Sequence, residues 1–446
     1  MTPFELPVLL SLYAEIAPGE LFRILQQNLG VRARNRIYTP RVVLWMMMGQ
    51  RLDPRGTLAS EVEQLVQGKL NPLLSQCKRV QEKDISLATG GYCQARQGLP
   101  LALMERSVEQ IIQRLREHLI PAAGVGDQRV YVVDGSSLQL DAQPALLRTY
   151  PPAENQHGKA HWPVVRMVVL HDVETGLAER PCWGPMNGPG AVSEQALAHQ
   201  AMEPLPPGSV ILGDRNFGIF SIVLGAQQRG HPVVLRLTGA RAKALLAGVS
   251  ISQEGEYPVE WRASRFDQLR PEIGSAPAGI AGRLIARRVG RGKSKQWLYL
   301  FTTLTIPADE VVEIYGRRWG VESDLRSLKQ TVRLQRLTVQ SVDLMQKELL
   351  AAVLAYNLVR AIMCLAARRV GIEPRQLSFT YAYNIVTDGL SDVLAAATEA
   401  EQLQRLERIV YLVGRCRLPN RSKHRSYPRT VWGRGYRYPI RPRREN

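Results

Sequence analysis

Apolar residues recur at three- and four-residue spacing over the first 120 residues of the chain. The clearest stretches are Leu21–Leu29, Pro40–Leu52 and Leu101–Leu119. This spacing is typical of helices that bury one face, and a proline at the first position of the second stretch suits a helix start. We therefore predict a helical domain over residues 1–120, followed by a linker at Pro121–Asp127.

Beyond the linker, the spacing of apolar residues changes to that of strands. Arg129–Ala142 predicts two short strands around Asp134-Gly135, and Leu177–Trp183 predicts a strand after a turn. Further strands are expected at Val164–Val173, Ser209–Asp214 and Pro232–Leu237, and helices at Ser193–Met202 and Phe217–Arg229. Several strands followed by alternating helix and strand indicate a mixed α/β layer fold.

The second half of the chain interrupts this pattern and then becomes helical. Short β-like runs over 239–305 predict a β-rich insertion, after which helical spacing dominates to Leu406. We accordingly expect one α/β unit in two parts, 128–238 and 306–372, with the insertion between them. A C-terminal helical region and a tail would occupy residues 373–446.

The charge of the chain is large and unevenly spread. It has 58 Lys and Arg against 40 Asp and Glu, a formal net charge of +18, and a pI near 10.0. The last 32 residues alone hold 11 basic side chains and one acidic side chain. Such a surplus favours a polyanionic partner, above all nucleic acid and less often an anionic membrane surface. Aromatic residues among the tail arginines suit phosphate contact and base stacking, although a non-specific DNA-affinity tail would have the same composition: Tyr427, Trp432, Tyr436 and Tyr438.

Cysteine usage and the N-terminus indicate where the protein works. The five cysteines are scattered and never form a C-x-x-C pair, which fits a reduced compartment without a disulfide framework or a zinc knuckle. The N-terminus lacks the basic region and cleavage site of a signal peptide. The best apolar runs, Val43–Met48 and Leu349–Val359, are shorter than the roughly 18 residues of a membrane span. We expect a soluble cytoplasmic protein without a membrane partner.

Two acidic residues stand at strand ends in this pattern. Asp134 closes a valine-rich strand, and Asp214 closes another. An ionised carboxylate there is costly unless it faces water or a cation, so the two acids could converge on one sheet edge and hold a divalent metal. Either acid alone would more simply be a turn former.

A third acid lies on a predicted helix, Ile314–Gln330. Its residues Tyr315, Arg318, Glu322 and Lys329 are three, four and seven positions apart. At about 100° per residue, they fall within an arc of roughly 60°, while Asp324 points to the opposite side. A carboxylate flanked by two cations and a phenol can ligate metal while gripping phosphates. A solvated face with an Arg318–Glu322 ion pair is the alternative.

The spacing Tyr-x2-Arg-x3-Glu-x6-Lys resembles the signature helix of the insertion sequence four (IS-four) transposases, which are cut-and-paste enzymes of the DDE type. VVDGSSLQL resembles the first-aspartate strand of this family, and ILGDRNFG resembles its second-aspartate segment. GYCQARQGLP resembles its N-terminal helical domain, and RSYPRTVWGRGYRYP resembles its basic terminus. These matches follow the family's order over most of the chain. Asn216 is a departure, since the family usually has glycine there.

The resemblance implies an RNase H-like core with Asp134, Asp214 and Glu322 as the catalytic triad. These acids would bind two Mg²⁺ ions, with Mn²⁺ as a substitute, for cleavage at transposon ends and strand transfer into target DNA. Residues implied to contact DNA are Tyr315, Arg318, Arg326, Lys329 and Trp297, the last by stacking on an extruded base. A tryptophan buried in a sheet is the alternative for Trp297. The partners would be the terminal inverted repeats, target DNA and a second copy of the chain in a synaptic homodimer, and the enzyme would be cytoplasmic and associated with the bacterial nucleoid when bound to DNA.

Two other functions remain open at this point. One is a metal-dependent nuclease without strand transfer, and the other is a domesticated, non-catalytic DNA-binding protein. The N-terminal domain would contact the inverted repeat or serve in dimerisation or packing. Residues with weaker signals are His157 and His161 (loop residues near the site), Asp141 and Asp172 (turn acids or backup ligands), Arg236 (partner of an acid or a phosphate) and Cys182 (a buried apolar residue).

Overall fold

The computed structural model describes most of the chain. The described residues are 19–30, 37–53, 55–74, 85–119, 128–156, 158–249, 251–269, 279–290, 295–334, 337–394 and 396–419. The predicted linker, His157 and the aromatic residues of the basic tail lie outside these ranges.

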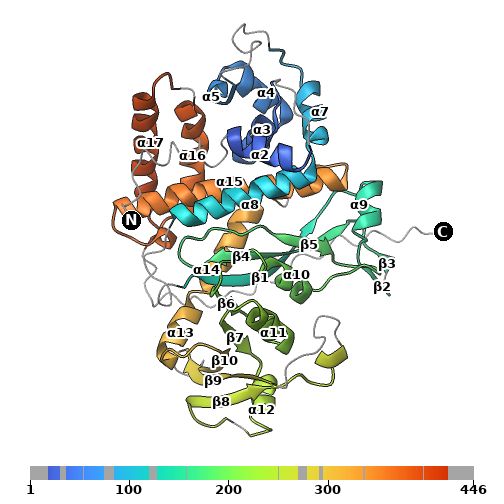
Figure 1. The fold of residues 1–446 in the computed structure, drawn as a ribbon, viewed down its shortest axis with the longest axis vertical. Coiled ribbons are helices and arrows are strands. Elements are labelled where there is room, and N and C mark those ends of the chain that lie inside the picture. The colour runs from blue at the N-terminus through green and yellow to red at the C-terminus, as the bar shows by residue number, and fades with distance from the viewer. Residues whose placement is uncertain are drawn as a thin grey trace, which may run out of the picture.

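One mixed sheet forms the centre of the fold, in the strand order β5-β4-β1-β6-β7-β10-β9-β8 (Figure 1). The strands are β1 (Val130–Gln139), β4 (Val164–Asp172), β5 (Cys182–Pro185), β6 (Val210–Gly213), β7 (Val233–Leu237), β8 (Gly255–Trp261), β9 (Ile280–Val289) and β10 (Gln296–Thr302). β4 pairs antiparallel with β1, whereas β6 pairs parallel with β1 and β7 pairs parallel with β6. The order β5-β4-β1-β6-β7 with these directions is an RNase H-like core, so the predicted fold class is confirmed.

Two predicted strand boundaries were wrong. The segment around Asp134-Gly135 forms a single strand, because β1 pairs with β4 without interruption from Tyr131 opposite Asp172 to Gln139 opposite Val164. Asp134 therefore lies within a strand and does not close it. Conversely, the strand predicted from Leu177 begins only at Cys182, and the residues before it form a turn whose backbone bonds to the end of β4.

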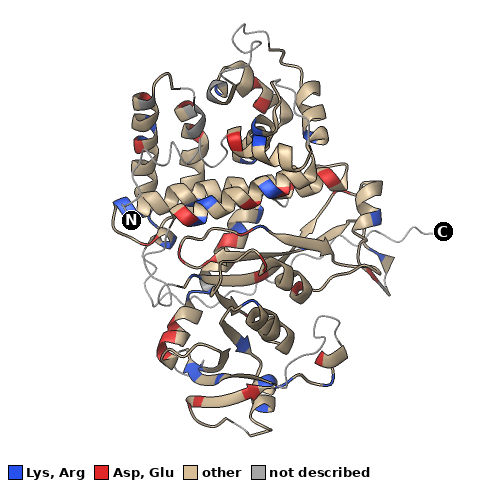
Figure 2. Cartoon of the chain, viewed as in Figure 1, with Lys and Arg blue, Asp and Glu red and all other residues tan. Residues whose placement is uncertain are grey.

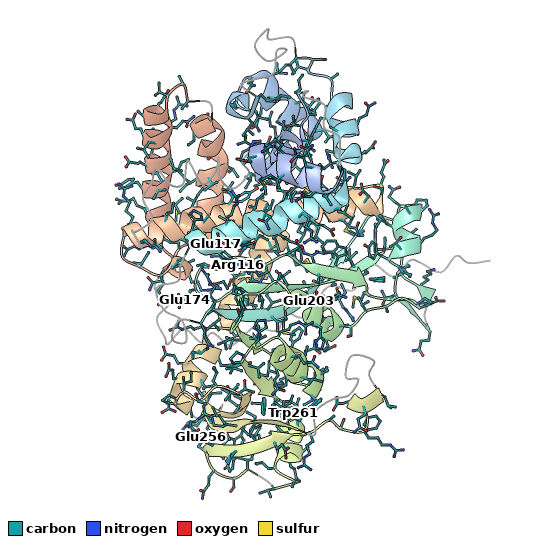
Figure 3. The ribbon with its side chains drawn as sticks, in the orientation of Figure 1. Arg116, Glu117, Glu174, Glu203, Glu256 and Trp261 are labelled. Carbon is teal, nitrogen blue, oxygen red and sulfur yellow. The ribbon has the colours of Figure 1, made fainter. Side chains whose placement is uncertain are left out.

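The β-rich insertion extends the core sheet instead of standing apart from it. Strand β10 pairs antiparallel with β7, with Tyr299 opposite Leu237 and Thr302 opposite Val234. Strands β9 and β8 continue the sheet outward. The insertion also has an aromatic contact of its own, since Trp261, labelled in Figure 3, packs edge-on against Phe301 with 4.8 Å between the ring centroids.

Different helices cover the two faces of the sheet. Tyr131 and Val133 of β1 pack with α10 (Glu194–Ala201) and α11 (Phe220–Gln228). The alternate residue Val132 and Leu212 of β6 instead pack with α13 (Ala308–Gly316) and α14 (Trp319–Arg326). Odd-numbered and even-numbered positions of β1 thus face different helix pairs, as expected for a strand covered on both sides.

A long helix, α15 (Val342–Arg369), links the sheet to the remaining helices (Figure 1). It shares one apolar core with N-terminal and C-terminal helices. These helices are α2 (Gly19–Asn28), α3 (Pro40–Leu52), α4 (Leu58–Val66), α5 (Asn71–Leu74), α7 (Gly90–Gly98), α8 (Leu101–His118), α16 (Phe379–Leu394) and α17 (Glu399–Gly414). Among the described residues, α15 is the one helix long and apolar enough to cross a membrane, but its apolar window is wholly buried in the protein, as in a core helix.

Polar contacts reinforce this junction. Glu348 of α15 is buried and forms ion pairs with Arg51 of α3 and Arg96 of α7. Lys347 donates to the carbonyl oxygens of Arg96 and Gln97 at 3.1 Å each. The N-terminal helices are therefore joined to α15 by buried charge as well as by apolar packing. Figure 2 shows basic and acidic residues interspersed along the described chain.

Candidate active site

Asp134 lies within β1, and Asp214 directly follows β6, the neighbouring parallel strand. The register of β1 and β6 sets Val132 opposite Leu212, and Asp134 and Asp214 each follow two residues later. Neighbouring strands are about 4.8 Å apart, and residues two apart share a face. Asp134 therefore lies on the face covered by α13 and α14, and the structure brings the two acids together there.

Burial and neighbouring charge act together on Asp134. Burial is the main cause that raises its pKa to about 6, and the carboxylates of Asp214 and Glu194 raise it further. The Gly135 N–H, which donates to Asp134 Oδ1 at 2.8 Å, and the Arg318 guanidinium act in the opposite direction. The carboxylates at this point thus outweigh the nearby cationic charge, which is the environment that a hard divalent cation relieves.

The predicted helix Ile314–Gln330 is interrupted. The continuous α-helix assumed for the 60° arc was therefore wrong. Helix α13 ends at Gly316, α14 begins at Trp319, and a π-helical turn occupies Ser327–Thr331. At the break, hydrogen bonds between residues three apart replace the α-helical bonds between residues four apart. The Arg318 N–H, for example, donates to the Tyr315 carbonyl at 3.1 Å. Glycine on either side of the break, at 316 and 320, lowers helix propensity there.

Tyr315 and Arg318 of the signature nevertheless lie near the aspartates, and Glu322 is linked to them through Arg318. Tyr315 is buried, and burial raises its pKa, with the cations Arg318 and Arg236 acting against this effect and Asp214 adding to it. The Arg318 guanidinium carbon lies 5.8 Å from the Tyr315 ring centroid. Arg318 Nη2 is 3.8 Å from Glu322 Oε1, and half of the Glu322 side chain is exposed (51%). Glu322 thus faces Arg318 through a long ion pair.

Lys329 reaches β1 from the π-helical turn. Its Nζ donates to Ser136 Oγ and to the Ser137 carbonyl, both at 3.0 Å. Burial lowers the pKa of Lys329. Because Ser136 lies two residues beyond Asp134, the amine stands beside the aspartates on the same face of β1.

Two further cations from the sequence prediction have different surroundings. Arg236 lies two residues after Val234 on β7, so both point to the face of the sheet that packs on α13. The charge of Arg236 acts to lower the pKa of Tyr315. Among the described residues, no carboxylate forms an ion pair with Arg236, so of its two predicted partners, an acid or a phosphate, the phosphate remains. Arg326 is exposed at the end of α14, away from these contacts.

Trp297 lies in the insertion and is half-buried, so the alternative of a tryptophan enclosed in the sheet is not what the structure shows. Its ring stacks on Tyr299 with 5.9 Å between centroids and an interplanar angle of 12°. The Arg288 guanidinium, opposite it in the sheet, lies 4.8 Å from the ring centroid. The pair of rings with a cation beside it has the chemistry of a base-stacking surface.

Sequence reasoning missed one acid, Glu194, at the first turn of α10. A Cβ at position 135 would lie 2.5 Å from its carboxyl carbon, so Gly135 is what allows Glu194 to approach β1. Asn216 donates its side-chain amide to Glu194, and its backbone N–H donates to Asp214 Oδ1 at 2.8 Å. The only sequence signal was Asn216 itself, the position at which the chain departs from the family pattern.

The weaker candidates fall outside this cluster. Asp172 is a buried turn acid paired with Arg129 at 3.0 Å, and Cys182 is buried, as predicted. His161 is exposed. Within the described parts of the chain, no three His, Cys, Asp or Glu side chains lie close enough to hold a metal ion, so Glu322 does not join the aspartates as a ligand set here.

The chain is similar to known proteins by family, by sequence and by structure. Residues 125–358 match the family described as "Transposase DDE domain", a range that contains Asp134, Asp214 and Glu322. The chain is 24% identical over 450 residues to the transposase InsG for insertion sequence element IS4 of Escherichia coli (strain K12), covering 98% of this chain and 95% of that protein. The chain also resembles the cryo-EM structure of the piggyBac transposase synaptic complex with hairpin DNA, with a TM-score of 0.41 and 12% identity, over 91% of this chain and 85% of that one.

Proposed function

Since the chain belongs to the DDE transposases, in the family of the insertion sequence four element, and acts in DNA transposition, we propose that Asp134, Asp214 and Glu322 are its catalytic carboxylates. The observation that carries this assignment is the parallel register that sets Asp134 beside Asp214. The excess of carboxylate around Asp134 supports it further.

The donor set suits a divalent metal. Ionised Asp134 and Asp214 offer the oxygen ligands that Mg²⁺ and Mn²⁺ prefer, and Glu322 would complete the set. Bound there, the metal would act as a Lewis acid that activates the attacking hydroxyl and stabilises the leaving oxygen. The chain's own contribution is to fix two acids on rigid strands and to carry the third on a separate helix.

The long ion pair between Arg318 and Glu322 has a role in this proposal. At 3.8 Å, with the Glu322 side chain half exposed, it holds Glu322 only weakly. When a DNA end enters, Arg318 exchanges Glu322 for a phosphate, and Glu322 turns to the aspartates. Arg236, Lys329 and Tyr315 then surround the same phosphate, and Trp297 receives an extruded base.

The reaction proposed for this site is an in-line displacement at phosphorus. Water first attacks the phosphodiester at the transposon end and releases a 3′-hydroxyl. That hydroxyl then attacks a second phosphodiester, so one strand is joined for each strand cut and no covalent enzyme–DNA intermediate is needed. The partners are the terminal inverted repeats and target DNA, and a synaptic homodimer would hold the two ends in the bacterial cytoplasm.

An end-cleavage assay tests the assignment. Purified protein is incubated with a labelled duplex that carries the element's own terminus, in Mg²⁺ or in EDTA. Asp134→Asn, Asp214→Asn and Glu322→Gln should each retain end binding and lose cleavage, whereas Asp141→Asn, the matched control at another predicted strand end, should cut normally. If Glu322→Gln cut at the wild-type rate while both aspartate variants were inactive, the third carboxylate would be another residue, with Glu194 the first to test.

Strand transfer separates the enzyme from the two alternative functions. With a pre-cleaved end and a second duplex, a transposase joins the free 3′-hydroxyl to the new strand. Cleavage without joining would favour a nuclease, and tight binding without cleavage would favour a domesticated DNA-binding protein.

A further inference from the structure

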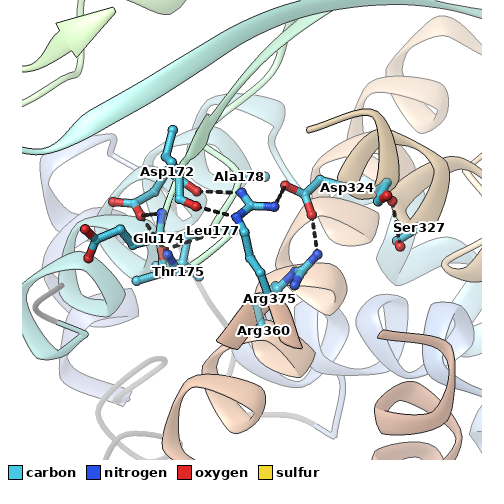
Figure 4. Close-up of polar contacts among 12 residues, drawn as sticks. Asp172, Glu174, Thr175, Leu177, Ala178, Asp324, Ser327, Arg360 and Arg375 are labelled. Atoms are coloured by element: carbon cyan, nitrogen blue, oxygen red, sulfur yellow. Dashed lines mark hydrogen bonds and ion pairs between the residues drawn. The ribbon is translucent and has the colours of Figure 1, made fainter. Parts of the chain in front are cut away.

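Asp324 lies two residues after Glu322 and so on the opposite side of α14. There it forms the buried ionic cluster that Figure 4 shows. Asp324 is fully buried, and its two carboxylate oxygens face two arginines from other elements. Oδ1 pairs with Arg360 of α15, and Oδ2 pairs with Arg375, 2.8 Å away, in the 3₁₀ turn Pro374–Gln376. Burial alone would raise the pKa of Asp324, but Arg360 and Arg375 outweigh it and hold the pKa below its usual value.

Both arginines are themselves anchored to the end of the sheet. Arg375 donates to the carbonyl oxygens of Asp172 and Val173, the former at 3.1 Å. Arg360 Nε donates to the Tyr356 hydroxyl at 2.8 Å, and that hydroxyl donates to the Gly176 carbonyl at 2.8 Å. The cluster of Asp324, Arg360 and Arg375, called here the Asp324 clamp, thus connects α14 with α15, the β4–β5 turn and the start of the C-terminal region.

The position of α14 depends on such a contact because the helix is not continuous with α13. The break at Arg317 and Arg318 removes the α-helical hydrogen bonds that would otherwise hold it in line. A cavity of about 480 Å³ opens beside the break, lined in part by Gly316, Arg317 and Gly320. A Cβ at position 320 would collide with the Arg375 guanidinium, so glycine there also gives Arg375 its path to Asp324.

We propose that Asp324 is a positioning residue for the cleavage reaction, which holds α14 so that Arg318 stays near the aspartate pair and Glu322 can reach it. The inference rests on the proposed catalytic role of Glu322. Asp324 touches neither DNA nor the reacting atoms in this assignment. It acts through α14, which carries Glu322 and begins directly after Arg318.

The test measures the single-turnover cleavage rate constant with protein in saturating excess over labelled end DNA. Asp324→Asn should lower this rate constant at least about tenfold, because displacement of a reacting group by about 1 Å can cost up to a hundredfold. The affinity for end DNA should change less than about threefold. Arg375→Lys, a milder change at a more exposed position, should give a smaller loss in the same direction if Asp324→Asn is poorly folded.

The matched control is Glu348→Gln, which breaks an equally buried pair of arginine contacts on α15 without touching α14. A purely structural role would lower the amplitude of product formed, since fewer molecules would be active, and leave the rate constant unchanged in both variants. That result, or a wild-type rate constant in Asp324→Asn, would overturn the inference. Glu322→Gln is measured alongside: an active Glu322→Gln would remove the proposed catalytic role of Glu322, on which the clamp depends, whereas an inactive Glu322→Gln with a normal Asp324→Asn would remove only the clamp.

Discussion

Asp134 on β1 and Asp214, directly after the neighbouring parallel strand β6, lie side by side, each two residues beyond the paired Val132 and Leu212. Their spacing is set by backbone hydrogen bonds and not by contacts between the carboxyl groups. The sheet therefore holds two like charges together at a cost to folding. This cost is what makes the site receptive to a cation, and it leads to the first prediction.

Asp134→Asn should stabilise the metal-free protein at neutral pH. Because the pKa of Asp134 in the folded chain, about 6, lies above the ordinary value of 3.8, ionisation of this group opposes folding at any pH above both values. Removal of the charge should raise the free energy of unfolding at pH 7.5 in EDTA by about 1–3 kcal/mol. The gain should shrink as the pH falls below about 6 and disappear below about pH 3, where the carboxyl is protonated in both states. Thermal unfolding of both proteins at pH 7.5 and at acid pH measures the gain in stability. An equal gain at both pH values would mean that Asp134→Asn acts through packing and not through charge.

Gly135→Ala should impair cleavage by displacing the Glu194 carboxylate. The new Cβ would lie 2.5 Å from the Glu194 carboxyl carbon, and the side chain would have to leave Asn216. We expect the cleavage rate to fall roughly tenfold. The double variant Gly135→Ala/Glu194→Ala should be no slower than Glu194→Ala alone, because both changes remove the same contact. Additive losses in this cycle would show that the methyl group acts elsewhere.

Lys329→Met should reduce cleavage much more than Ser136→Ala. Lys329 Nζ has two acceptors on β1, and the Ser137 carbonyl remains when the serine hydroxyl is removed. If the amine acts on a phosphate, its loss should cost on the order of a hundredfold in the single-turnover rate, against less than about threefold for Ser136→Ala. Equal losses would mean that the amine serves to hold the turn against the strand.

Arg236→Gln should weaken binding of end DNA and reduce its dependence on salt. Removal of one phosphate contact should lower the slope of log K against log salt by about 1. Arg262→Gln is a suitable control, because this exposed arginine is paired with Glu260 at 2.7 Å. Filter binding at several salt concentrations gives both slopes. An unchanged slope for Arg236→Gln would exclude a direct phosphate contact.

Trp297→Leu should abolish base capture, while Trp297→Phe should retain part of it. Stacking of a base on an aromatic ring contributes roughly 1–3 kcal/mol, and leucine keeps the apolar volume without the ring face. Fluorescence of 2-aminopurine placed near the transposon end reports extrusion of a base. If leucine supported the same signal as tryptophan, another ring, with Tyr299 the nearest, would be the stacking partner.

Residues along single strands were predictable from the sequence, and residues joined by tertiary contacts were not. Alternation and valine content identified the strands that carry Asp134 and Asp214. The spacing of Tyr315, Arg318 and Glu322 is equally compatible with a continuous helix and with the broken one observed, because periodicity does not register a two-residue break. Glu194 lies 60 positions from Asp134 in the chain, so only the packing of α10 on the sheet brings it near.

The shared sheet has a consequence for how the enzyme can move. Since β10 is hydrogen-bonded to β7, the strand that carries Trp297 belongs to the same continuous sheet as β1 and β6, which position the aspartates. The hydrogen-bonded sheet would then fix the distance between the captured base and the cleaved bond. Adaptation to DNA ends must fall instead on the helical segments that carry Tyr315, Glu322 and Lys329, because hydrogen bonds of the sheet do not hold them.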